Sequence, residues 1–230
     1  MKDRVSPGMA VAIVGVAVFL IVAVLFGFTV VSEDEEAALT VVFDPAAYVE
    51  DNWDAVRTAI KEDAVPLADI LGRIEPAADG TVVTEELIPV AEELGVVASK
   101  EAQVYRVSGT GTVSDVDVES SKGSIGIDLD GYDGPIALRL WVGTRIPSDN
   151  SSVRDASGFI EFGDFRDQTE YGKVAKEINK KVAADLESMD KESLQGKHID
   201  FTGAFTNRTF NQPTIDISGI NVVPIEVTES

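Results

Sequence analysis

The sequence predicts an α+β protein that is anchored in a membrane by one N-terminal helix. An uncharged apolar run lies near the start, segments with helical spacing of apolar residues follow, and five segments with alternating apolar residues come next. The predicted divisions are a cytoplasmic N-terminus over residues 1–8, a transmembrane signal anchor over 9–31, a helical segment over 32–103 and a β domain over 104–230.

The apolar run from Met9 to Val31 contains no charged residue, and as a helix it is long enough to cross a hydrocarbon core of about 30 Å. Lys2 and Arg4 precede the run, and four acidic residues follow it, from Glu33 to Glu36. The positive-inside rule therefore places the N-terminus in the cytoplasm and the C-terminal domain outside the cell membrane. A cleaved signal peptide is the alternative, but the apolar stretch of such a peptide usually has only about 7–15 residues. We expect an uncleaved single-pass anchor in contact with membrane lipid.

The helical segment begins with Asp44-Pro45, which is typical of a helix start because Asp accepts hydrogen bonds from free backbone amides and Pro tolerates the first turn. Apolar residues then recur at helical spacing from Ala46 to Ile74, and Pro66 is expected to divide this run. Thr84 is expected to cap a further helix that ends at Gly95. Each helix has one apolar stripe, which we expect to pack against one side of the β domain.

The β domain opens with a long predicted strand from Val104 to Val118. Gly109 and Gly111 lie inside it, and glycine within a strand is typical of the sharp bend at a barrel corner. The apolar parity changes after Ser114, which indicates a β-bulge near Asp115. Alternating apolar residues predict the other strands at 124–129, 136–142, 198–205 and 215–227, with a helix from about 170 to 189.

This order of three strands, a helix and two strands predicts an OB-like five-stranded β-barrel with a helix between strands 3 and 4. A small β-sandwich would also fit the same strands. Asp167 with Glu170 resembles a capping box, which supports a helix start between the third and fourth strands.

The composition excludes several kinds of site. The net charge is −21, and such an acidic surface repels phosphate backbones, so we expect no nucleic-acid partner. The chain has no cysteine and one histidine, His198, which excludes thiolate and histidine-based metal sites, and we expect neither a metal nor another cofactor. A Ser-His-Asp triad would need His198 and a G-x-S-x-G elbow, which the chain lacks, so a structural histidine is favoured.

Arg139, Trp141 and Tyr132 are the candidate ligand-binding residues. OB barrels bind oligonucleotides or oligosaccharides on the face of strands 2 and 3. Arg139 and Trp141 alternate along the third predicted strand, and Tyr132 lies near the turn before it. An aromatic ring beside an arginine can stack on a sugar, so a carbohydrate is a candidate ligand. The competing interpretation is that the N-terminal helices cover this face.

Four stretches resemble a bacterial family of predicted periplasmic lipoproteins of unknown function, whose genes often neighbour sugar ABC transporters. They are FDPAAYVEDNW, VYRVSGTGTV, VRDASGFIEFGDFRDQTEYGKVAKEINKKV and LQGKHIDFTGAF. The most specific stretch runs from Phe159 to Val182, where Phe165, Gln168, Tyr171 and Asn179 stand at matching places. The resemblance implies an extracytoplasmic location and components of an ABC transporter as partners, and it carries over no catalytic residue. Members usually have a lipobox cysteine, and here a helical anchor would replace it.

The sequence therefore predicts a membrane-anchored, extracytoplasmic accessory or binding protein beside a sugar ABC transporter, and not an enzyme. A structural envelope module that binds proteins and no small molecule is the alternative. A carboxylate-based hydrolase is the third candidate, but with 40 acidic residues some carboxylate pairs are unavoidable and carry little information.

Overall fold

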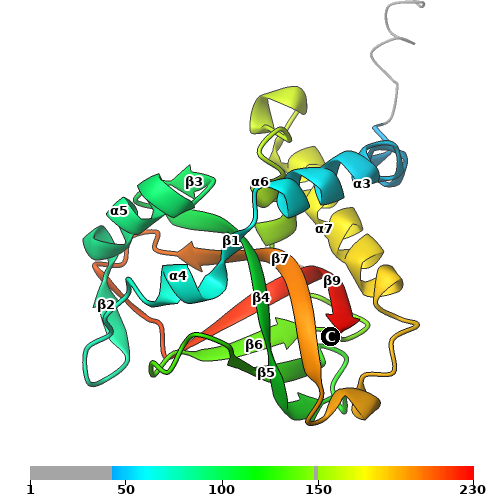
Figure 1. Ribbon diagram of the computed structural model, residues 1–230. Helices are drawn as coiled ribbons and strands as arrows, with labels where there is room; N and C mark the ends of the chain where they lie inside the picture. Colours follow the sequence, from blue (N-terminus) through cyan, green and yellow to red (C-terminus); the bar gives the residue numbers. More distant parts are fainter. Residues whose placement is uncertain (1–42, 148–149) are drawn as a thin grey trace, which may run out of the picture. The chain divides into compact units, whose positions relative to one another are not determined.

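The computed structural model describes residues 43–147 and 150–230, and Asp44–Ser230 forms one compact unit of helices and strands (Figure 1). This confirms the predicted α+β class. The predicted cytoplasmic stretch over 1–8 and the anchor over 9–31 lie outside the described residues. Within the described ranges, no helix combines the length and the apolar character that a membrane crossing requires.

Five strands pair in a closed ring. Their bounds are β4 (Ala102–Asp117), β5 (Ser124–Leu129), β6 (Ala137–Trp141), β7 (His198–Arg208) and β9 (Gly219–Glu229). The pairs β4–β5, β5–β6, β7–β9 and β4–β7 are antiparallel, whereas β6 and β9 are parallel. Because the pairing returns to β4, the five strands form one ring and not two separate layers, and the predicted order of three strands, helix and two strands is confirmed.

The shorter elements lie around this five-stranded ring. Before β4 come α3 (Pro45–Glu62), β1 (Val65–Pro66), α4 (Leu67–Leu71), β2 (Thr81–Val83), α5 (Thr84–Leu94) and β3 (Val97–Ala98). After β6 come α6 (Ser152–Ser157), the 3₁₀ turns Phe162–Asp164 and Glu192–Leu194, α7 (Gln168–Asp185) and β8 (Thr214–Asp216). Figure 1 shows α3 beside α6 and α7, and α5 beside β3, so the helices form two groups outside the ring.

The core fills the inside of the ring. Leu138 and Leu140 on β6 are buried, whereas Arg139 and Trp141 between and beyond them are only partly buried and face outward. The same alternation on β7 buries Ile199 together with the other inward residues of that strand. Alternating apolar residues therefore set which face of each strand lines the core.

The expected kink and bulge of β4 are both present. The register with β5 shifts between Val113 and Asp115, as the change of apolar parity predicts. A Cβ atom at Gly109 would come within 2.5 Å of the Phe201 ring, and one at Gly111 would overlap the carbonyl oxygen of Asp128. The ring can close here because these positions carry no side chain.

The first helices begin and end close to the predicted positions. Asp44 caps α3 by accepting hydrogen bonds from the amides of Ala46 and Ala47, and Pro66 separates α3 from α4, both as predicted. The prediction that Thr84 caps α5 is wrong. Val83 is the cap residue, because Thr84 bonds instead to the loop between β7 and β8: its amide donates to the Pro213 carbonyl and its hydroxyl to the Gln212 carbonyl.

The predicted strand over 215–227 is two strands. β8 pairs with β2 and β9 with the ring, and the chain changes partner at Ile217, whose amide donates to the Gly80 carbonyl. The apolar parity changes at this bend, because Ile215 and Ile217 are buried before it and Ile220 and Val222 after it, with Ser218-Gly219 between them.

Gly111→Ala is expected to lower the free energy of unfolding by about 1–3 kcal/mol, because the added methyl group meets rigid backbone of β5. Urea denaturation measures the change. Gly172→Ala in α7 is the matched control: its Cβ would meet nothing within 4 Å, and it is expected to gain about 0.5–1 kcal/mol. Equal effects of the two substitutions would contradict the close approach at Gly111.

Candidate ligand-binding cleft

The structure places the three predicted ligand-binding residues in two different hollows. Arg139 and Tyr132 line a groove of about 760 Å³ beside β4, β5 and β6, and Trp141 lines a separate cleft of about 470 Å³. Arg139 donates to Ser124 Oγ at 3.0 Å and pairs with Asp115, and the Tyr132 hydroxyl accepts from the Ile136 amide at 3.1 Å. Arg139 and Tyr132 thus have local partners that hold strands and a turn together.

The groove is acidic. Asp115, Asp128, Asp130 and Asp133 line it. In the part of the chain that the structure describes, no three His, Cys, Asp or Glu side chains are placed to hold a metal ion. Among the described residues, those that line the groove have no buried polar atom without a partner, whereas Asn207 in the cleft at Trp141 has one, so the cleft is the stronger candidate site.

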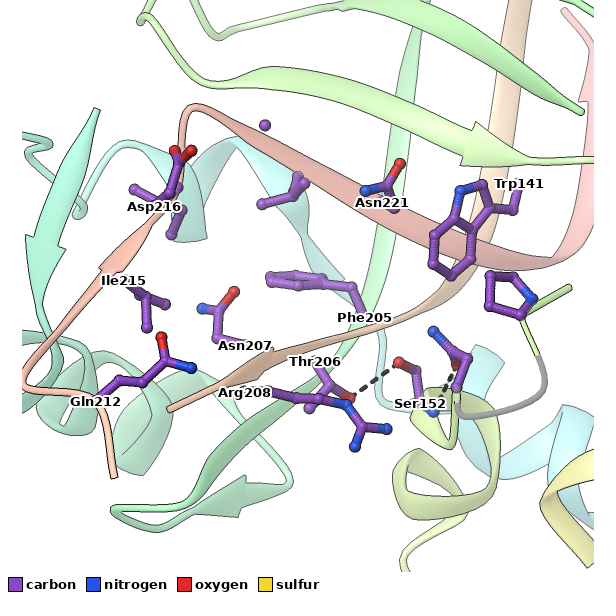
Figure 2. A pocket seen from close by; sticks show the side chains of 15 residues that line it. Trp141, Ser152, Phe205, Thr206, Asn207, Arg208, Gln212, Ile215, Asp216 and Asn221 are labelled. Atoms are coloured by element: carbon purple, nitrogen blue, oxygen red, sulfur yellow. Dashed lines mark hydrogen bonds between the residues drawn. The ribbon is translucent and has the colours of Figure 1, made fainter. Parts of the chain in front are cut away.

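The cleft opens where β9 changes its neighbour. β9 pairs with β6 over Gly219 to Val222 and with β7 only from Val223 onward. β7 pairs with β4 along its whole length, but its last residues, from Phe205 to Arg208, have no partner on β9. The end of β7 and the start of β9 therefore diverge, and side chains from both line the space between them (Figure 2).

The cleft has a buried floor and an exposed polar rim. The buried lining residues are Ser152, Phe205, Asn207, Ile215, Ile217 and Ile220. The exposed ones are Arg208, Gln212, Asp216, Gly219 and Asn221. Trp141, Pro147 and Asn150 are half-buried, and Figure 2 shows Trp141 beside Asn221 at one end and Asp216 at the other. An apolar floor with a few polar groups is typical of a small-molecule site.

The wall near Trp141 is held by α6 and α7. Asn179 on α7 is buried and donates to the carbonyls of Asn150, at 2.8 Å, and Pro147, at 3.3 Å. Ser152 at the start of α6 donates its amide to Asn150 Oδ1 and accepts from Thr206 Oγ1 on β7, both at 2.9 Å. The segment of highest resemblance to the lipoprotein family thus supplies the side chain that positions this wall.

Tyr171, another matching residue, fixes α7 against α6. The Arg154 guanidinium lies 3.5 Å from the centre of the Tyr171 ring, donates to the Tyr171 carbonyl and pairs with Asp155. Arg154 is buried, so this cation–π contact and ion pair are shielded from solvent and orient the start of the wall.

Two charged side chains of opposite sign lie on the described part of the rim. Hydrogen bonds from the backbone amide and side chain of Ser218 lower the pKa of Asp216, so it is a carboxylate at neutral pH. Arg208 brings the opposite charge and donates to Ser151 Oγ at 3.3 Å. Among the described lining residues, Asp216 is the one carboxylate and Arg208 the one cation. These two described charges have opposite signs and lie on the same rim.

Three buried polar atoms near the floor have no hydrogen-bond partner among the described residues: Gln103 Oε1, Tyr105 Oη and Asn207 Nδ2. They share one face of the β4–β7 ribbon, because Gln103 pairs with Asn207 and Tyr105 with Phe205. The two aromatic rings stack with centroids 4.8 Å apart, and burial raises the pKa of Tyr105, which stays a neutral phenol. Only Asn207 of the three polar residues also lines the cleft.

Sequence reasoning selected Trp141 but missed Asn207 and the rest of the floor. A signal was present: Ile199, Phe201 and Phe205 set the inward parity of the strand, and Asn207 continues it. A polar residue at an inward position of a strand is informative, because burying an amide without a partner is unfavourable.

Comparisons with known proteins agree with this architecture. The family model described as "Predicted periplasmic lipoprotein (DUF2291)" matches residues 18–228. A crystal structure of an OB-fold protein from Thermotoga maritima is similar with a TM-score of 0.59 and 18% sequence identity, over 82% of this chain and 99% of that chain. This likeness shows the fold, which is that of an OB-fold protein. No curated protein matches the chain.

Asn179→Ala is expected to lower the free energy of unfolding by about 1–3 kcal/mol, because the carbonyls of Pro147 and Asn150 lose their buried donor. Urea denaturation followed by tryptophan fluorescence measures this loss. Asn52→Ala is the control, since Asn52 is half-exposed and donates only within α3, to the Tyr48 carbonyl. If both variants lose the same small amount, Asn179 does not hold the wall.

Proposed function

The chain belongs to the family of predicted periplasmic lipoproteins, and we propose that it is a membrane-anchored, extracytoplasmic protein that binds a small carbohydrate. We further propose that it acts as an accessory to a sugar ABC transporter. The observation that carries the proposal is the cleft in which a half-buried tryptophan lies beside exposed amide and charged side chains.

The chemistry of the cleft suits a sugar. A tryptophan ring offers a flat apolar surface to the C–H face of a sugar, and planar polar groups can bond its hydroxyls. Trp141, Asn221 and Gln212 supply these two kinds of group. The volume of about 470 Å³ falls within the range of about 300–1,000 Å³ that small-molecule sites occupy.

We propose binding without catalysis. Glycoside hydrolysis generally needs two carboxyl groups that flank the bond to be cleaved. Asp216 is the one carboxylate among the described residues that line the cleft, so this cleft does not favour a carboxylate-based hydrolase.

We propose the apolar run from Met9 to Val31 as the membrane anchor. The sequence has no cysteine, so it offers no thiol for the lipid of a lipoprotein. We propose that this uncharged apolar run supplies the attachment instead, since as a helix it is long enough to cross the membrane, and Lys2 and Arg4 before it favour a cytoplasmic N-terminus. A domain held at the outer face of the membrane is close to the entrance of any transporter that it serves.

A second candidate function, a structural envelope module that binds another protein, is favoured by one surface feature. Phe159 and Phe162 are 39% and 54% exposed in the stretch that resembles the lipoprotein family most. Large exposed aromatic residues are enriched where proteins contact one another. Such a module would need no ligand in the cleft.

A panel of neutral mono- and disaccharides is expected to include at least one that raises the melting temperature of the full chain in detergent. A ligand at 100 times its Kd adds about 2.7 kcal/mol to the stability of the folded state. Trp141→Ala is expected to remove this shift, and Arg139→Ala, on the same strand but in the acidic groove, is expected to keep it. No shift with any sugar, together with co-purification of a membrane protein, would favour the second candidate.

The full chain is expected to remain with membranes after an alkaline carbonate wash. Leu20→Arg combined with Val24→Arg should release it, because each charge near the centre of a membrane helix costs about 2.5–3.5 kcal/mol. The control is Leu20→Ile with Val24→Ile, which keeps the run apolar. Retention of the double-arginine variant would show that another group anchors the protein.

A further inference from the structure

We infer that the side-chain amide of Asn207 is the specificity-determining contact of the cleft, and that it recognises a hydroxyl group of an uncharged, polyhydroxylated ligand. This inference rests on the proposed carbohydrate-binding function and names the atom that would form a hydrogen bond with the ligand. Asn207 lines the cleft, is 7% exposed, and its Nδ2 has no partner among the described residues.

The position of Asn207 aims this free donor at the ligand space. Asn207 lies in the part of β7 that has left β9, and Figure 2 shows its side chain extending from β7 into the space below β8 and β9, between Ile215 and Phe205. Both of these neighbours are buried and apolar. A hydrogen bond formed there would be largely shielded from water, which makes it selective.

The free donor of Asn207 selects the kind of group that fits. Gln103 Oε1 is also unpaired, but Gln103 does not line the cleft, so of these atoms Asn207 Nδ2 is the one that a ligand in the cleft can reach. A group placed there must accept a hydrogen bond, which a hydroxyl or a carboxylate can do and an ammonium cannot. The net charge of −21 disfavours an anion, which leaves the hydroxyl.

An unpaired buried amide destabilises the protein when no ligand is bound. Replacing it with an apolar group of similar shape removes an unsatisfied donor, which is neutral or stabilising. Residues that serve the fold behave in the opposite way, because their removal breaks existing contacts. Asn207→Leu therefore separates a residue kept for binding from one kept for stability.

The test uses the full chain in detergent and the neutral sugar of the panel that gives the largest thermal shift with the wild type. Asn207→Leu is expected to raise the melting temperature without sugar by about 2–4 °C and to weaken sugar binding by about tenfold or more in calorimetry. Asn52→Leu is the matched control, since Asn52 lies on α3 and does not line the cleft, and its sugar affinity should equal that of the wild type.

Single-deoxy derivatives of the same sugar identify the hydroxyl. One derivative is expected to bind the wild type about tenfold or more weakly than the parent sugar does. On Asn207→Leu, the same derivative and the parent sugar are expected to have equal affinities. A fall in the melting temperature of Asn207→Leu, or unchanged sugar affinity in that variant, overturns the inference and leaves the proposed function standing. If no sugar shifts the wild type, the proposed carbohydrate binding fails, and this inference fails with it.

Discussion

The structure depends on one change of partner within one strand. β9 is parallel to β6 up to Val222 and antiparallel to β7 from Val223, so this one strand closes the ring and leaves the end of β7 without a strand neighbour on that side. Close contact at the change is possible because Gly203 carries no side chain: a Cβ atom there would overlap the Val223 carbonyl oxygen. The cleft is thus a geometric consequence of how the ring closes.

The helices between β6 and β7 support one wall of the cleft that the ring leaves open. Asn179, Ser152 and Thr206 connect α7, α6 and β7 by hydrogen bonds to the residues that form one wall of the cleft. Removing any of these bonds would leave carbonyl or hydroxyl groups unpaired in a partly buried place, which is unfavourable. This gives a physical reason why Asn179, in the stretch with the strongest family resemblance, lies behind one wall of the cleft.

The sequence predicted the strands well, since alternation of apolar residues is a local property, and β5 lies at the predicted residues. It predicted the site only in part. Arg139 and Trp141 are two residues apart on one outward face, so sequence spacing suggested a shared patch, but the surrounding loops divide that face into the acidic groove and the cleft. The cleft includes Ile215 and Asp216 of β8, which is far from β6 in the sequence, and no local pattern encodes such a contact.

The charge of the whole molecule bears on how the cleft could select a ligand. A net charge of −21 creates a field that repels anions and attracts cations over distances of several ångströms, but it exerts little force on an uncharged solute. A neutral ligand must therefore be distinguished by short-range contacts alone. The rim at Gln212 and Asn221 is exposed, where water competes for every hydrogen bond, whereas the floor at Asn207 is buried. Discrimination between one neutral solute and another is consequently strongest at the floor, where an unmet hydrogen bond has no water to replace it.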